Sequence, residues 1–162
     1  MTGHSAFDEH DHAACAHDAL ARADRTCAER AVKLTPIRRQ VLEILAESHR
    51  PVGAYDLIER LGAEGKRPAP TTVYRALDFL LEQGFAHRIE SRNAFVACSH
   101  GHADGEVTVF LICEGCGAAA EAEAAGLGAE LARLTAGVGF APRAQIVELA
   151  GQCRLCRSAT ER

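Results

Sequence analysis

The chain has 162 residues, enough for one generous domain or two small ones. No run of about 18 apolar residues occurs, and the first residues are polar and acidic, so neither a membrane span nor a secretory signal is expected. The net charge is −4, yet basic residues outnumber acidic ones between Arg30 and Arg75, while acidic residues prevail from Asn93 onwards. This asymmetry predicts two regions with different partners.

The N-terminal half has the pattern of several short helices. Residues 1–12 are expected to form a disordered tail, and the alanine-rich stretch that follows is expected to be helical. A second helix is predicted to begin at Pro36, with Thr35 as its N-cap, because proline is favoured at the first helical position. Two more helices are predicted, one from Ala54 and one over 71–83, each with apolar residues at helical spacing.

Two short alternating stretches after these helices, at 85–90 and 94–97, predict a β-hairpin. Helices followed by a hairpin are typical of a winged helix-turn-helix, in which the last helix enters the major groove of DNA. A three-helix core without that function would share the periodicity, but the last helix also has a polar, basic outer face. We therefore predict a winged-helix DNA-binding domain over 13–92. The candidate DNA contacts on that helix are Thr71, Thr72, Tyr74 and Arg75.

The remainder, 93–162, has a different pattern. An apolar strand is predicted over 107–112, a return strand over 118–123, a helix over 127–138 and a third strand over 143–149. The apolar strand could extend a sheet across a dimer. We expect an α/β dimerisation domain here, so that the fold class of the whole chain is α+β.

Four of the seven cysteines form two pairs with identical spacing. Two residues between cysteines let both thiolates reach one metal ion, and two such turns complete a tetrahedral shell. The alternatives are redox dithiols or chance pairs, but two matched pairs favour a closed, structural zinc site. Clustered cysteines also favour a reducing cytoplasm. The predicted ligands are Cys113, Cys116, Cys153 and Cys156.

A second group of potential ligands remains after these cysteines are assigned. An isolated His87 would be interpreted as a core histidine, but Cys98 follows on the partner strand and further histidines come directly after it. A mixed set of imidazole, thiolate and carboxylate groups suits zinc. Since the ligands come from both halves, bound metal would hold the two domains in one orientation. The group comprises His87, Cys98, His100, His102, Glu106 and Glu121.

Three features together resemble the ferric uptake regulator (Fur) family of metal-dependent repressors. These are Leu34-Thr35-Pro36-Ile37-Arg38, the run from Pro70 to Leu77, and the paired CxxC motifs. The stretch from Thr72 to Phe85 is similar to the zinc uptake regulator (Zur) branch. The resemblance implies a cytoplasmic homodimer that represses zinc-uptake genes by binding a palindromic operator when it is loaded with zinc.

The resemblance also implies roles for particular residues. The four paired cysteines would hold one structural zinc per subunit, and His87, Cys98 and Glu121 would hold one regulatory zinc. His102 is favoured as the fourth regulatory ligand over His100 and Glu106, although an alignment without gaps places Glu106 there. Tyr55 joins Arg75 as a base-contacting residue, and Arg75 would make a bidentate contact with guanine.

Other functions are also consistent with parts of the pattern. A family member that senses iron or peroxide is one alternative, and a zinc storage or chaperone protein is another, although the latter leaves the polar helix face unexplained. A zinc hydrolase would need an open coordination position, and HExxH does not occur. We therefore expect a regulator and no enzyme. The histidines at the N-terminus are interpreted as part of a solvated tail.

Overall fold

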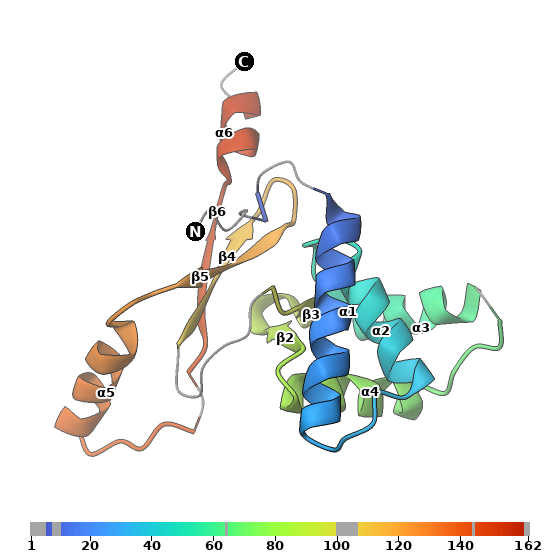
Figure 1. Ribbon diagram of the computed structural model, residues 1–162. Coiled ribbons are helices and arrows are strands. Elements are labelled where there is room, and N and C mark those ends of the chain that lie inside the picture. The colour runs from blue at the N-terminus through green and yellow to red at the C-terminus, as the bar shows by residue number, and fades with distance from the viewer. Residues whose placement is uncertain (1–5, 8–10, 64, 100–106, 144, 161–162) are drawn as a thin grey trace.

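The structure is a computed structural model that describes residues 6–7, 11–63, 65–99, 107–143 and 145–160. The helices of the N-terminal half form one lobe, and an elongated sheet from the C-terminal half stands beside it (Figure 1). The hairpin of β2 (Ala86–Ile89) and β3 (Ala94–Ala97) lies between them. The predicted α+β class, a winged-helix region followed by a unit built on a sheet, is confirmed. Among the described helices, none is both long enough and apolar enough to cross a membrane.

The N-terminal helices lie close to their predicted positions. Thr35 is the N-cap of the second helix and Pro36 its first residue, but the Thr35 side chain makes no capping hydrogen bond. Proline fits there because its missing N–H would have no partner within the helix. The four helices are α1 (His12–Glu29), α2 (Pro36–Ala46), α3 (Ala54–Ala63) and α4 (Pro70–Glu82).

One continuous apolar core holds these helices together. Each helix buries the face on which its apolar residues repeat, as Val41 and Leu45 do on α2 and Leu57 does on α3. On α4 the expected inner residues Val73 and Leu77 are buried as well. Full burial of such a side chain contributes about 1.5–3 kcal/mol to the stability of the fold. The shared core therefore holds the four helices against one another.

The hairpin belongs to a small antiparallel sheet with strand order β1-β3-β2. Its strands are β1 (Val52–Gly53), β2 (Ala86–Ile89) and β3 (Ala94–Ala97), and the short 3₁₀ helix η1 (Glu90–Arg92) joins β2 to β3. Phe95 and Ala97 on β3 pack into the N-terminal core. The N-terminal sheet therefore continues beyond position 92, the predicted end of the winged-helix domain.

The C-terminal unit is a three-stranded sheet of order β5-β4-β6. Strand β4 (Thr108–Cys113) pairs antiparallel with β5 (Ala119–Glu123) and parallel with β6 (Val147–Gly151). Helix α5 (Leu127–Gly137) lies in the crossover, and helix α6 (Arg154–Thr160), which was not predicted, follows the last strand. The third strand begins at Val147 rather than at 143, because Val147 is the first residue that pairs with β4.

Candidate metal centres and nucleic-acid interface

The four paired cysteines come together at one end of the C-terminal sheet. Cys113 ends β4, Cys116 lies in the following turn, Cys153 follows β6 and Cys156 lies in α6. Because β4 and β6 run parallel, with Cys113 opposite Gly151, both CxxC segments leave the sheet at the same edge. The four sulfur atoms all lie within 4.8 Å of one another, an arrangement that fits the donor set of a closed tetrahedral zinc site.

Two glycines shape the first cysteine turn. Gly117 has a φ of +77°, a left-handed conformation that favours glycine, and its N–H donates to the Cys113 carbonyl at 2.9 Å. Gly115 faces Cys156, and a Cβ added there would lie 2.9 Å from the Cys156 sulfur. The absent side chain at Gly115 therefore leaves the space into which the second pair fits.

The thiols of this cluster differ in acidity. Burial by itself raises the pKa of Cys113, but hydrogen bonds from the backbone N–H groups of Cys153, Cys116 and Gly115 lower it to about 6. Hydrogen bonds from the Cys156 thiol to Cys153 and Cys113 raise the pKa of Cys156 to about 12. One sulfur is thus prepared as a thiolate near neutral pH, whereas another must lose its proton when a metal binds.

A second cluster joins the hairpin to the C-terminal sheet. His87 lies on β2, Cys98 follows β3, and Glu121 lies on β5. The His87 Nε2 atom is 3.7 Å from Glu121 Oε1, and the Cys98 sulfur is 3.8 Å from Glu121 Oε2. One ligand atom from each residue lies within 4.8 Å of the others. Three residues distant in sequence therefore meet as one mixed nitrogen, sulfur and oxygen set.

Burial makes this cluster suited to a cation. Only 6% of the Glu121 side chain and 21% of the His87 side chain are exposed, and Cys98 is buried. A buried carboxylate is costly without compensating partners, and here Glu121 accepts the Ser99 N–H at 2.9 Å. The His87 ring also packs against Phe110, with ring centroids 5.2 Å apart, so His87 contributes to packing while its imidazole faces Glu121. The donor set fits zinc.

The fourth ligand of this second cluster remains a prediction. The candidates His100, His102 and Glu106 lie outside the described residues. Across the part of the chain that the structure describes, only the two clusters above bring three or more potential ligands together.

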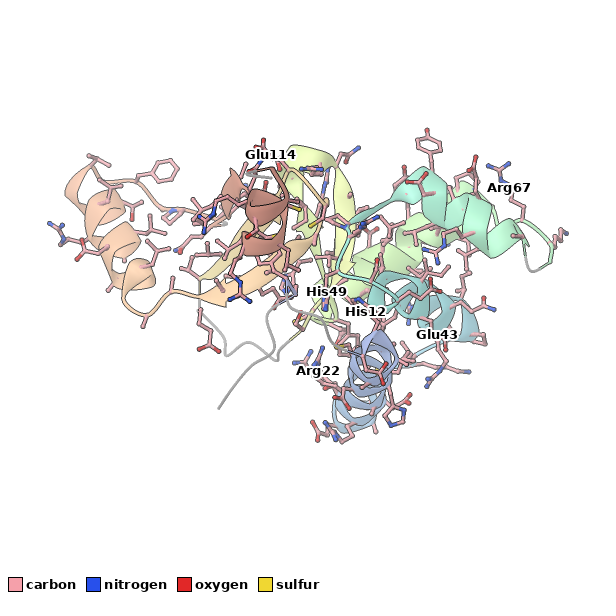
Figure 2. All side chains as sticks on the ribbon, turned by 90° about the horizontal axis from the view of Figure 1, so that it is seen from above. His12, Arg22, Glu43, His49, Arg67 and Glu114 are labelled. Atoms are coloured by element: carbon pink, nitrogen blue, oxygen red, sulfur yellow. The ribbon has the colours of Figure 1, made fainter. Side chains whose placement is uncertain are left out.

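The expected N-terminal tail is described only in part. His4 and His10 lie outside the described residues, as does most of the segment 1–10, whereas α1 already begins at His12. The His12 ring lies beside that of His49, with centroids 5.3 Å apart (Figure 2). The start of α1 therefore lies beside the segment between α2 and β1. That segment contacts the C-terminal sheet, because the His49 carbonyl accepts the Ala119 N–H.

The candidate DNA-contacting residues lie on the surface. Thr71, Thr72, Tyr74 and Arg75 are all exposed on the outer face of α4, and Tyr55, at the start of α3, is 75% exposed. An exposed tyrosine contributes little to a fold, so this exposure is consistent with a contact surface.

Several nearby basic residues have structural partners instead. Arg38 stacks on the Phe79 ring at 3.6 Å, and Arg39 and Arg60 form ion pairs with Asp24 and Glu47. Part of the positive charge of the N-terminal half is therefore paired with acidic neighbours at the surface.

Two long-range contacts at the ends of the hairpin were not foreseen from the sequence. Arg22 on α1 donates to the backbone carbonyls of Cys98 and Ser99, on the side of α1 that faces the C-terminal unit (Figure 2). Glu148 on β6 accepts two backbone N–H groups from η1. Both partnerships span more than fifty residues, and neither has a local pattern by which it could have been found.

The chain matches the model of the ferric uptake regulator family over residues 29–149. It is 42% identical to the zinc uptake regulation protein of Escherichia coli (strain K12), covering 85% of this chain and 80% of that protein. A zinc uptake regulator complexed with zinc and DNA is 39% identical, with a TM-score of 0.85 over 91% of this chain and 98% of that one.

A second protein, XcZur, has solved structures in two forms. Holo XcZur is 42% identical with a TM-score of 0.78, over 86% of this chain and 96% of that one. Apo XcZur is 41% identical but has a TM-score of only 0.52, over 88% and 97%. Sequence identity and coverage hardly differ between the two forms. The difference in TM-score therefore reflects a different arrangement of the chain in the apo form. On the family match and these identities, the chain belongs to the ferric uptake regulator family.

Proposed function

We propose that this chain is a zinc-responsive, DNA-binding transcriptional repressor of zinc-uptake genes. It belongs to a family of regulators, and its similarity to zinc uptake regulators extends over most of its length. It acts as a regulator rather than an enzyme, in the cytoplasm, where its operator DNA is found. The observation that carries the proposal is the meeting of His87, Cys98 and Glu121 between the hairpin and the C-terminal sheet.

DNA recognition is assigned to the outer face of α4. Thr71, Thr72, Tyr74 and Arg75 are exposed on one helix whose opposite face is buried, so they are free to enter a major groove. Arg75 would make the bidentate contact with guanine that is worth about 1–3 kcal/mol of discrimination. Tyr55 at the start of α3 adds a second contact.

Metal sensing is assigned to the mixed cluster, and a structural role to the four cysteines. A zinc ion would supply a divalent charge that neutralises Cys98 and Glu121 in their buried setting. His87 and Cys98 belong to the DNA-binding half and Glu121 to the other, so these ligands meet only when the halves are closely packed. Occupancy then favours that arrangement, and DNA affinity is coupled to zinc by the same free energy.

The likeness to holo XcZur, and the much weaker likeness to its apo form, support this assignment. The closely packed arrangement of this chain also corresponds to the relative that is complexed with zinc and DNA. We infer that the packed arrangement is the one competent to bind DNA.

A homodimer is proposed from the C-terminal surface. Helix α5, which is described over its whole length, has no buried residue, and large apolar side chains on it and around β6 are exposed. Exposed apolar surface of this extent marks an interaction site, and a second copy would cover it. Two copies would present two α4 helices to the halves of a palindromic operator. The exposed residues are Leu134, Val138, Phe140, Ile146, Leu149 and Leu155.

A gel-shift titration in buffered zinc tests the proposal. Zinc is expected to raise affinity for a palindromic operator by orders of magnitude. Arg75→Ala serves as a control that binds zinc normally but loses preference for the operator. Equal DNA binding with and without zinc would exclude the sensing role, and the absence of any sequence-specific binding would exclude the DNA role.

A further inference from the structure

Glu148 on β6 makes a bidentate contact with the turn of the hairpin. Its Oε1 atom accepts the Glu90 N–H at 2.6 Å, and its Oε2 atom accepts the Ser91 N–H at 3.1 Å. Hydrogen bonds to a charged acceptor are stronger than neutral ones, and two of them fix the orientation as well as the distance. This one carboxylate therefore fastens the C-terminal sheet to the tip of the hairpin.

The two N–H groups are ones that the turn cannot satisfy by itself. Glu90 and Ser91 begin the 3₁₀ helix η1, and the residue before it, Ile89, provides no side-chain cap. The first N–H groups of a helix have no partner within it. Although burial opposes ionisation, the hydrogen bonds from Ser91 and Glu90 lower the pKa of Glu148, which is consistent with a carboxylate held by these donors.

The register of the sheet shows how this contact relates to the mixed cluster. Phe110 on β4 lies directly opposite Glu121 on one side and opposite Glu148 on the other. Residues opposite each other in a sheet project from the same face, so the two carboxylates flank Phe110 in one row. That row faces the hairpin, because Phe110 contacts the His87 ring.

The two carboxylates hold different parts of the hairpin. Glu121 lies beside His87 and accepts the Ser99 N–H beyond the end of β3, whereas Glu148 holds η1 at the opposite end of the hairpin. Apolar residues of the hairpin and the sheet pack together between them, namely Ile89, Val96, Phe110, Ile112 and Ala119. The Glu148 contact therefore involves none of the described residues of the mixed cluster.

We propose that Glu148 is a positioning residue that holds the hairpin against the C-terminal sheet without help from metal, and so sets the zinc concentration to which the mixed cluster responds. This inference rests on the proposed function. By linkage, any contact that favours the packed arrangement raises the apparent affinity of a ligand that requires it. Loss of Glu148 lowers the packed fraction, and the apparent dissociation constant for zinc rises by the same factor.

The test compares Glu148→Gln with Glu123→Gln in the full chain carrying its structural zinc. Glu123 is exposed on β5 of the same sheet, opposite Thr108, and no hydrogen bond joins it to the hairpin among the described residues, so its replacement makes the same change in charge without that contact. Zinc binding by the mixed cluster is followed by competition with a chelator, and operator binding by gel shift. Hydrogen exchange of the Glu90 and Ser91 amides is measured before zinc is added to the mixed cluster.

Glu148→Gln is expected to raise the zinc midpoint, the free zinc concentration at which half of the mixed clusters are occupied, about tenfold. This corresponds to about 1.4 kcal/mol. Operator binding at saturating zinc should return to the wild-type level, and the two amides should lose protection. Glu148→Ala, which removes both acceptors, should shift the midpoint further. Glu123→Gln should behave as wild type in every measurement.

Three results would overturn the inference. One is an unchanged zinc midpoint in both Glu148 variants. Another is operator binding that falls at saturating zinc with no shift of the midpoint, since that indicates only damage to the fold. The third is protection of Glu90 and Ser91 that survives in Glu148→Ala. If wild-type protein showed no zinc-dependent DNA binding, the proposed function would fail, while amide exchange would still decide whether Glu148 holds the hairpin.

Discussion

The two halves of this molecule are stabilised in different ways. The N-terminal half has a continuous core in which leucines such as Leu42, Leu45 and Leu57 are fully buried. The C-terminal unit has a three-stranded sheet, and its helix α5, all of it described, buries no residue. Its strand ends are instead brought together at four cysteine sulfurs that lie within 4.8 Å of one another.

This difference indicates what each half needs in order to fold. The helical half is stabilised mainly by burial of apolar side chains, each of which contributes about 1.5–3 kcal/mol. A small sheet with an exposed helix needs further constraints, and the metal ligation and homodimer of the proposed function would supply them. We therefore expect changes at the cysteines or at the exposed apolar surface to affect the C-terminal unit selectively.

The largest effect is expected for Cys113→Ser. Cys113 is buried, and backbone hydrogen bonds lower the pKa of its thiol to about 6, so it is a thiolate ligand at neutral pH and its loss should release the structural zinc. Binding of such a metal provides about 10–16 kcal/mol in small zinc domains, so the C-terminal unit should unfold. Circular dichroism should retain most of the helical signal, while sedimentation should show loss of the dimer.

Cys15→Ser is the matched control for this change. Cys15 is half-buried on α1 and belongs to neither of the two clusters. A Cys113→Ser protein that kept its zinc content and its dimer would contradict the view that the cysteine cluster holds the C-terminal unit together.

The next largest effect is expected for His87→Ala, on function rather than on folding. The N-terminal core does not include His87, so thermal unfolding should change little, whereas one ligand of the mixed cluster is lost. Zinc-dependent operator binding should weaken by about 100-fold or more, because loss of a residue that only supports a ligand already costs about 10–100-fold. His17→Ala on the exposed face of α1 is the control. If the His87 variant unfolded but kept its zinc response, the mixed cluster would be the structural site and the four cysteines the regulatory one.

A smaller effect is expected for Leu134→Asp on α5. The Leu134 side chain is 65% exposed, so its replacement should cost the isolated chain little stability. A charge placed in an apolar interface should nevertheless weaken dimerisation by about 10-fold to 100-fold, which analytical ultracentrifugation measures. Ala132→Asp, on the same helix but off the Leu134 face, should leave the dimer intact. Equal dimerisation of both variants would place the interface elsewhere.

The smallest effect is expected for Gly115→Ala. The added methyl group would lie 2.9 Å from the Cys156 sulfur, so the turn must shift at a cost of about 1–3 kcal/mol. Zinc should be lost to a chelator several-fold faster than from wild type. Gly151→Ala is the control, because a Cβ there meets no atom within 4 Å. Identical rates for the two variants would show that the turn relaxes freely.

Much of the fold could be predicted from local patterns. Apolar spacing, with proline and glycine as markers, located the starts of α2, α3 and α4 within one residue. The short helix α6 and the two-residue strand β1 were missed because neither has a periodicity of its own. Strand β6 was placed four residues too early, since its start depends on where β4 offers a partner.

Of the two candidate metal sites, one could be predicted from local spacing and the other depends on tertiary packing. The matched spacing of the cysteine pairs indicates a shared site because each pair is local, and the parallel β4 and β6 then deliver both pairs to one edge. The approach of His87, Cys98 and Glu121 depends on how the hairpin packs against another sheet, which the motifs by themselves did not determine.

The sequence by itself determined the helices other than α6, the hairpin, the pairing of the cysteines and the family, because these depend on spacing along the chain. Only the tertiary structure decided which face of the C-terminal sheet meets the hairpin, and therefore which carboxylates face it. The strand register places Glu121 and Glu148 in one row on either side of Phe110, and the packing turns that row toward the hairpin. Contacts of this kind are set by the packing of distant surfaces, which leaves no periodic pattern in the residues that make them.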